Sequence, residues 1–289
     1  MIRKPIVAGQ FYESDEKKLI QQIEESFSHQ KGPGSIPSGQ REGSIKGVIS
    51  PHAGYPFSGP CAAHGFKAIA ESEMADLYII LGPSHIGFHK SCFSEDDWET
   101  PLGLARTDSD FGLILEENHI NLIPMPHKEE HSIEVQVPML QYACRDKEDK
   151  MMFVPVMVAE TDYKETAERL QKAISEYVEK GKSIVLIASS DFTHLGANYG
   201  FMPFSENVKD NMYKLDKGAI DKILKLNPEG FMEYCEETGA TICGKYAIYV
   251  MIEVMRSLKA SPKLLQYYTS ADILGDYSNA VGYASILFS

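Results

Sequence analysis

The chain has 289 residues, and its 28 lysines and arginines stand against 41 aspartates and glutamates, which gives a formal net charge of -13. This charge repels a phosphate backbone, so no nucleic acid is expected as a partner. A chain of this length can bury about three quarters of its unfolded surface without disulfides or structural metals. Any bound metal is therefore expected to serve function and not folding.

The N-terminal segment and the cysteines bear on location. The segment MIRKPIVAGQFYESDEKK begins with basic residues but lacks the apolar run of a signal peptide, and nowhere do 18 apolar residues follow one another. The five cysteines include no CxxC pair, so neither a disulfide framework nor a zinc knuckle is indicated. We expect a cytoplasmic protein with no membrane partner.

Buried strands and amphipathic helices alternate along the chain. Apolar stretches that predict strands lie at 45–50, 75–82, 151–160 and 183–190. Helices are predicted at 15–28, 61–71, 161–181, 207–226 and 240–258, followed by two β-rich segments at 264–272 and 280–288. This alternation predicts an α/β fold with three layers, αβα, and a mostly parallel sheet. Since no repeat or linker divides the sequence, we expect a single domain over residues 1–289.

Histidines lie in the loops that follow three of the predicted strands. His52 follows GVIS, His85 follows YIILG, and Asp191 and His194 follow IVLIASS. A single histidine in such a place is more often a hydrogen-bonded loop or core residue. In open parallel sheets, however, ligands bind at the carboxyl ends of the strands, where the loops converge. The coincidence at three strand ends therefore predicts one shared metal-binding or catalytic pocket.

Two further segments carry candidate residues. Cys243, in GATICGKYAI, precedes a predicted helix, and the positive end of the helix dipole would lower its pKa and favour a nucleophilic or metal-binding thiolate. A structural thiol is the alternative. His131 and Glu134, in HKEEHSIEVQVPMLQ, lie three apart on a predicted helix, which suits substrate contact or support of a ligand. A solvated helix face is the alternative there. The other histidines are expected to be surface or structural residues: His29, His64, His89, His119 and His127.

Signatures of other enzyme classes are absent from the sequence. There is no P-loop, no GxGxxG after a strand, no GxSxG elbow and no HExxH. We therefore expect no nucleotide cofactor, and serine-hydrolase chemistry loses support.

Several ordered segments resemble one known family. RKPIVAGQFYES, ISPHAGYPFSGPCAAHGF, LGPSHIG, EEHSIEVQVPMLQ, ASSDFTHLG, GATICGKYAI and AVGYASILF are similar to the Memo (mediator of cell motility) family, whose prokaryotic members are also called AmmeMemoRadiSam system protein B. The resemblance extends from the first few residues to the last. It implies the fold of the class III extradiol dioxygenases, with a mostly parallel or mixed central sheet between helical layers.

The resemblance also implies roles for individual residues. Dioxygenases of that class hold a non-haem ferrous ion with two histidines and a carboxylate, beside a catalytic histidine. By motif position, His52 and His85 would be the histidine ligands and His194 the acid or base. Cys243 would stand where the dioxygenases have glutamate, and a thiolate shifts metal preference towards Cu(I), Zn or a differently tuned iron. Asp191 would be a ligand or would orient His194 through its ring N–H.

Three functions follow as alternatives. The first is a metal-dependent, dioxygenase-like oxidoreductase with Fe(II) or Cu, or Zn, bound by His52, His85 and Cys243, while His194 moves protons. The second is a non-redox enzyme in which Cys243 is the nucleophile and His194, oriented by Asp191, is its base. The third is a binding module whose pocket recognises a peptide or a modified side chain. The expected ligand is accordingly a small molecule or a peptide.

Overall fold

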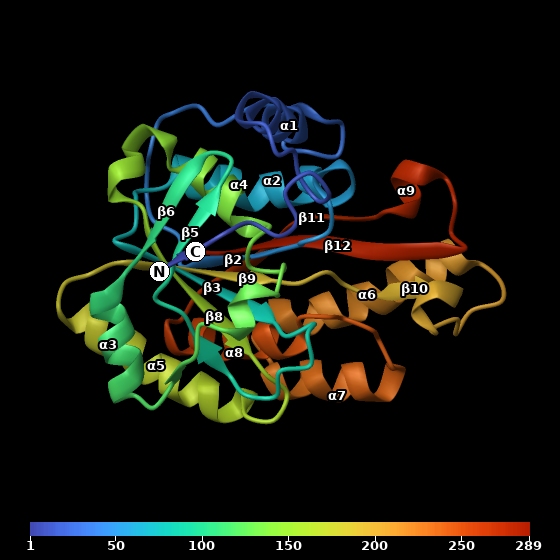
Figure 1. Ribbon diagram of the computed structural model, residues 1–289. Helices are drawn as coiled ribbons and strands as arrows, with labels where there is room; N and C mark the ends of the chain where they lie inside the picture. The colour runs from blue at the N-terminus through green and yellow to red at the C-terminus, as the bar shows by residue number, and fades with distance from the viewer.

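A large mixed sheet passes through the middle of the molecule between two layers of helices (Figure 1). The computed structural model describes residues 1–289 apart from the side chain of Glu148. The helices are α1 Glu16–Ser28, α2 Tyr55–Glu71, α3 Ser109–Glu117, α4 Gln136–Ala143, α5 Tyr163–Glu179, α6 Val208–Leu224, α7 Pro228–Thr238, α8 Lys245–Ser257 and α9 Ala271–Leu274, with 3-10 turns at Pro126–Lys128, Arg145–Lys150 and Ala197–Tyr199.

The strands follow the order β1-β5-β6-β8-β3-β9-β2-β12-β10 across the sheet, with β11 paired to β12 and β4 paired to β7 and β8. Their bounds are β1 Ile2–Arg3, β2 Gly47–Ser50, β3 Leu77–Pro83, β4 Cys92–Phe93, β5 Asp97–Thr100, β6 Gly103–Thr107, β7 Asn121–Leu122, β8 Met152–Val158, β9 Ile184–Ser189, β10 His194–Gly196, β11 Pro262–Thr269 and β12 Asn279–Phe288. The central strands β8, β3, β9 and β2 pair in parallel, whereas β12 pairs antiparallel with its neighbours. The predicted three-layer αβα fold is confirmed, with a mixed sheet whose centre is parallel.

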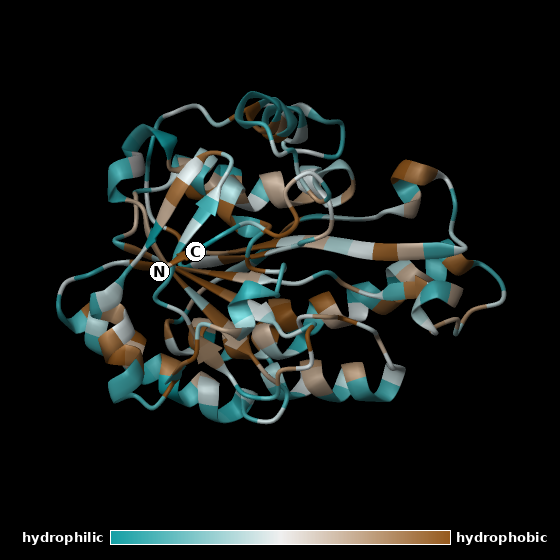
Figure 2. Cartoon of the chain, in the orientation of Figure 1, coloured by the Kyte–Doolittle hydropathy of each residue, from teal (hydrophilic) through white to brown (hydrophobic). Residues whose placement is uncertain are grey.

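The central strands are buried on both faces because helices cover both. Tyr78 and Ile80 of β3 pack in the hydrophobic cluster that includes residues of α1, α2 and α4. Ile79 and Leu81 of the same strand pack in the other cluster, with α3, α5 and α8. Figure 2 shows hydrophobic residues along the central strands and hydrophilic residues on the helices around them. Burial on both faces explains why the sequences of these strands are unbroken apolar runs.

Helix α2 begins at Tyr55, six residues before the predicted start at Cys61. The prolines of PFSGP were expected to form a loop. Pro56 lies in the first turn, where a missing N–H costs nothing because that group has no partner inside the helix. Gly59 allows α1 to approach closely, since a Cβ at this position would lie 2.6 Å from Ser26 Oγ. The packing of α1 on α2 thus outweighs the local turn signals.

The segment around His131 also differs from the prediction. It was expected to be helical, but α4 begins only at Gln136, and His131 to Val135 form turns before it. His131 and Glu134 therefore do not share a helix face. Among the described residues, no helix has both the length and the apolar character that crossing a membrane requires.

Candidate metal centre

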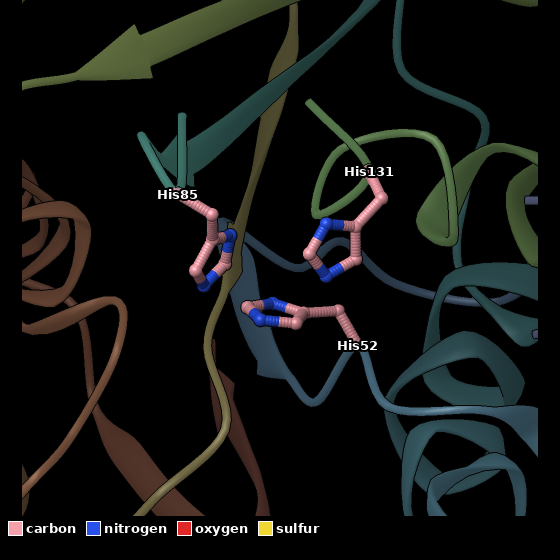
Figure 3. Close-up of side chains that lie close together, drawn as sticks. All are labelled: His52, His85 and His131. Atoms are coloured by element: carbon pink, nitrogen blue, oxygen red, sulfur yellow. The ribbon is translucent and has the colours of Figure 1, made fainter. Parts of the chain in front are cut away.

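Three histidines meet at the carboxyl edge of the sheet. His52 and His85 follow β2 and β3, which both pair in parallel with β9, and His131 comes from the turns before α4. One ring nitrogen of each lies within 4.8 Å of the others. The ring centroids are 5.3 Å apart for His52 and His85, 5.7 Å for His52 and His131, and 4.7 Å for His85 and His131. The three rings face a common space (Figure 3).

The hydrogen bonds around His52 determine its tautomer. The Ser189 hydroxyl donates its hydrogen to the Ser132 carbonyl at 2.7 Å and accepts from Gln136 Nε2 at 2.8 Å. The Gln136 amide is itself oriented by its bond to the Pro51 carbonyl. Ser189 can therefore only accept from His52 Nδ1, which lies 2.9 Å away. His52 thus carries its hydrogen on Nδ1 and has a free lone pair on Nε2.

Glu130 orients His85 in the same way. The Glu130 carboxylate accepts from His85 Nδ1 at 2.9 Å and from the His85 backbone N–H at 2.6 Å. Burial lowers the pKa of His85, but the hydrogen bond and charge of Glu130 outweigh burial and raise it overall. Glu130 is itself buried, yet its bonds to His85 hold its pKa at about 2. This carboxylate, behind a histidine whose Nε2 faces the pocket, is the arrangement that commonly supports metal-binding histidines.

His131 is the third member of the cluster and packs against Phe11. The centroids of the two rings are 5.0 Å apart in an edge-to-face arrangement. Its Nδ1 lies 3.5 Å from Glu130 Oε1. Burial lowers the pKa of His131. The pKa of His52 is also lowered, first by burial and then by the charges of the neighbouring His85 and His131. Both rings therefore favour the neutral form that binds metals.

Asp191 and Cys243 form a second group around His52. One ligand atom from each of His52, Asp191 and Cys243 lies within 4.8 Å of the others. Asp191 Oδ1 accepts from the backbone N–H groups of His52 and Ala53, at 2.8 and 3.3 Å. Cys243 Sγ lies 3.3 Å from His52 Nε2. The predicted convergence of His52 with Cys243 is therefore seen in the structure.

The predicted lowering of the Cys243 pKa is wrong. Burial and the nearby charge of Asp191 raise the pKa of the thiol well above its usual value. Cys243 also lies just outside α8, whose first residue is Lys245. A helix dipole contributes about 0.3–1 kcal/mol, less than one pKa unit, so it does not compensate for loss of water around a thiolate.

His194 begins β10 and lines the same cavity. Its Nδ1 lies 3.0 and 3.1 Å from the carbonyl oxygens of Phe192 and Thr241, so this nitrogen must donate and Nε2 keeps its lone pair. We expected Asp191 to accept a hydrogen bond from the His194 ring N–H, but the two backbone carbonyl oxygens accept it instead. Tyr199 packs edge-on against the ring, with centroids 5.1 Å apart.

A cavity of about 520 Å³ opens beside these histidines. His52, His85, His131 and His194 line it together with Asp191. The rest of the wall is largely apolar and includes Phe11, Phe57, Tyr199, Leu274, Val281 and Tyr283. Among the described residues, neither lysine nor arginine lines this cavity. Apolar side chains with a few polar groups are the usual lining of a pocket for a small molecule.

Glu134 is placed away from the cavity, in a buried network with the N-terminal segment. Its carboxylate pairs with Arg3 at 2.6 Å and accepts from the N–H groups of Ile6 and Val7 and from the Tyr12 hydroxyl. Burial, with the charge and hydrogen bond of Glu134, raises the pKa of Tyr12. Glu134 therefore supports the segment that bears His131 and does not contact a ligand in the cavity.

Sequence reasoning missed the residues that orient the histidines. Glu130, Ser189 and Gln136 were not singled out, although Glu130 stands beside His131 in the sequence. Glu130 contacts His85 across 45 residues and Ser189 contacts His52 across 137 residues. Of these residues, only Ser189 carried a sequence signal for the site, because it stands at the end of a predicted buried strand.

The donor set fits a metal ion. In His52 and His85 a hydrogen bond holds Nδ1, so Nε2 is the nitrogen left for a metal. His131 adds a third imidazole, and one ring nitrogen of each histidine lies within 4.8 Å of the others. Imidazole suits Zn, Cu, Fe and Ni. Residues that hold such an ion would be His52, with either His85 and His131 or Asp191 and Cys243.

Comparison with known proteins agrees with the sequence motifs. Residues 3–287 match the model of a family described as Memo-like protein. A MEMO1 family protein of Methanopyrus kandleri is 39% identical over 100% of this chain and 99% of its own length. Similar proteins of the same name come from Nitrosopumilus maritimus, 37% identical over 100% of both chains, and Saccharolobus solfataricus, 38% identical over 100% of this chain and 99% of the relative. The chain belongs to the Memo family.

Proposed function

We propose that the pocket binds Fe(II) or Cu, with Zn as an alternative ion, and that the protein is a metal-dependent oxidoreductase acting on a small organic ligand. The observation that carries this proposal is the fixed orientation of His52 and His85. Ser189 and Glu130 accept hydrogen bonds from the two Nδ1 atoms, and one ring nitrogen of each histidine lies within 4.8 Å of a ring nitrogen of His131. The family resemblance to class III extradiol dioxygenases supports the oxidoreductase class.

The residues around the metal position would have separate roles in the reaction. A bound metal would supply Lewis-acid or redox chemistry next to the ligand. His194 would hold or accept a proton at Nε2, because its Nδ1 hydrogen is committed to backbone carbonyls. The apolar wall with Phe57 and Tyr283 would exclude water from the ligand.

Elemental analysis tests the metal site. The untagged protein is purified without oxygen, and its Fe, Cu and Zn contents are measured beside those of His52→Ala. His89→Ala is the matched control, because His89 is an exposed histidine four residues beyond His85. We expect about one metal per chain in the wild type and the control, and a loss of most of it in His52→Ala. Equal metal content in all three proteins would contradict the proposal.

A binding module is the second candidate, and the mouth of the cavity favours it. Tyr199 and Leu274 line the cavity and are 45% and 61% exposed, so large apolar side chains stand at the entrance. Exposed apolar surface of this kind suits a peptide or a modified side chain. Binding of a ligand that is recovered unchanged after long incubation with the metal-loaded protein would favour this candidate.

Thiol catalysis has the least support. The group nearest the Cys243 thiol is His52 Nε2, and the raised pKa of the thiol disfavours the thiolate that such chemistry needs. His194, the expected base, directs its N–H away from Asp191.

A further inference from the structure

One carboxylate lines the cavity beside the histidines, and it belongs to Asp191. This side chain is buried, with a relative exposure of 4%. Its Oδ1 accepts from the backbone N–H groups of His52 and Ala53, whereas Oδ2 accepts no hydrogen bond from a described residue. A buried carboxylate is costly unless hydrogen-bond donors or a positive charge compensate it. One oxygen of Asp191 is therefore left for a group inside the cavity.

The protein itself supplies no cation for this carboxylate. Neither lysine nor arginine lines the cavity, and the ion pairs of the described residues do not include Asp191. His85 pairs instead with Glu130. The formal net charge of -13 also favours the approach of cations over anions. The positive partner of Asp191 is therefore expected from the ligand.

Four aromatic side chains line the cavity together with Asp191, and these are Phe11, Phe57, Tyr199 and Tyr283. Burial raises the pKa of Tyr199 and of Tyr283, and the charge of Asp191 raises both further, so the two hydroxyl groups lie near this carboxylate. The faces of aromatic rings attract ammonium groups. An anionic ligand would instead be repelled by Asp191. The wall thus combines the two features that recognise an organic cation.

We propose that the organic ligand of this cavity is a small amine in its ammonium form. The inference rests on the proposed function, because it takes this cavity as the place where the organic ligand binds. The ammonium group donates to Asp191 Oδ2, and the apolar part of the amine lies among the aromatic side chains. A volume of about 520 Å³ is in the usual range for small-molecule pockets. Since the three histidines form a ligand group without Asp191, a metal bound there leaves this carboxylate free.

Three probes of similar shape test the charge preference of the wild type. Phenethylamine is a cation at about pH 7, phenethyl alcohol is its neutral counterpart, and phenylacetate is an anion. Each probe is titrated into the metal-free full chain, and ligand-observed NMR gives the dissociation constant. We expect phenethylamine to bind about tenfold or more tightly than phenethyl alcohol, as a hydrogen bond to a charged group predicts. Phenylacetate should bind most weakly.

The variant Asp191→Asn tests the carboxylate. Asparagine keeps Oδ1 as the acceptor for the N–H groups of His52 and Ala53 but removes the negative charge. The variant should bind phenethylamine and phenethyl alcohol with affinities within about a factor of two. Asp276→Asn is the matched control, because Asp276 is an exposed aspartate that does not line the cavity. This control should keep the wild-type preference for the amine.

Two variants of Tyr199 test the aromatic wall. Tyr199→Phe keeps the ring, whereas Tyr199→Leu keeps an apolar side chain without the ring. The leucine variant should lower the preference for phenethylamine over phenethyl alcohol by about threefold or more, because the attraction between ring and cation is lost. The phenylalanine variant should stay close to the wild type.

Equal binding of phenethylamine and phenethyl alcohol by the wild type, or no binding of phenethylamine, would overturn the amine proposal. An unchanged preference in Asp191→Asn would do the same. The comparison of the three probes on the wild type needs no variant, so it decides the question even if a variant misfolds. It also needs no metal. Its failure therefore leaves the metal-dependent function standing, whereas a failure of metal binding in the elemental analysis leaves the amine preference standing.

Discussion

Ser189 determines which nitrogen of His52 is available to a metal. Its hydroxyl accepts from His52 Nδ1 because it donates to Ser132 and also accepts from Gln136. Ser189→Ala removes this acceptor and frees the imidazole to change tautomer. We expect metal affinity to fall by about 10- to 100-fold, the usual effect of losing a group that orients a ligand.

Isothermal titration with Co(II) measures this effect. Ser175→Ala is the control, because the hydroxyl of Ser175 bonds only to the exposed backbone of α5. Wild-type affinity in Ser189→Ala would show that the tautomer of His52 does not depend on this hydrogen bond.

Cys243 is expected to react slowly with alkylating agents. Its raised pKa leaves little thiolate near neutral pH, and the thiolate is the reactive form. In metal-free protein, iodoacetamide should modify Cys243 more slowly than a free cysteine at pH 7, and the rate should still rise above about pH 9. Mass spectrometry of the Cys243 peptide at several pH values measures this. A rate that levels off below about pH 8.5 would mean that the thiol is not shifted upwards.

Asp216 should make stability depend on pH. This buried carboxyl of α6 accepts from the Thr193 N–H and the Tyr267 hydroxyl, and burial raises its pKa from 3.8 to about 6. Between these values the unfolded chain has lost the proton while the folded chain keeps it, so stability falls as pH rises. The shift corresponds to about 3 kcal/mol.

Asp216→Asn removes this titration. We expect the wild type to lose stability between about pH 4 and pH 7 from this group, and the variant to lack that loss. Urea unfolding at pH 4, 5 and 7 gives both curves. Identical pH dependence of the two proteins would exclude the raised pKa.

At the scale of elements, the segment 130–136, which ends at the first residue of α4, orients all three histidines. Glu130 holds His85, and Gln136 together with the Ser132 carbonyl fixes the hydroxyl that holds His52. His131 lies within the same segment. Its conformation therefore decides the geometry of the whole centre.

Arg3 anchors this segment from β1. It donates to the carbonyls of His127 and Glu130, at 2.6 and 2.9 Å, and pairs with Glu134. Arg3→Met leaves the buried Glu134 carboxylate without its cation, which typically costs about 3–5 kcal/mol of stability. We also expect weaker Co(II) binding than in the wild type, because the 130–136 segment loses its anchor.

The variant Arg3→Lys distinguishes the effect of the positive charge of Arg3 from the effect of its hydrogen-bonding geometry. Lysine keeps the positive charge but lacks the planar fork that reaches two carbonyls and a carboxylate together. Stability by urea unfolding should be intermediate, and Co(II) affinity should remain reduced. Full recovery of affinity in Arg3→Lys would show that charge alone is sufficient.

The sequence predicted the parts of the site that depend on strand ends. His52, His85, Asp191 and His194 were expected together because parallel strands place their carboxyl ends at one edge. The place of His131 could not be predicted, because HSIEVQVPML has helical periodicity and the turns before α4 depend on Arg3 and Glu134, far apart in sequence. The pKa of Cys243 depends on burial in the folded protein, which local helix signals do not reveal.

For the whole molecule, the two hydrophobic clusters cannot separate, because the same strands supply both. Along β9, Val185 and Ile187 belong to the cluster on the α2 side, whereas Leu186 and Ala188 belong to the cluster on the α8 side. In β2, Val48 and Ile49 divide in the same way. Loss of one helical layer would expose one face of every central strand.

We therefore expect residues 1–289 to unfold as one domain in a single transition. Each central strand is packed against helices on both faces. Melting one helical layer would expose apolar surface, at a free-energy cost of about 25 cal/mol per Å², and would destabilise the other helical layer. In calorimetry of the metal-free protein, the van't Hoff and calorimetric enthalpies should agree. A saturating metal should raise the midpoint without splitting the transition, because it binds only the folded pocket. Two transitions, or a calorimetric enthalpy well above the van't Hoff value, would place a boundary between independently folding units and contradict the single domain.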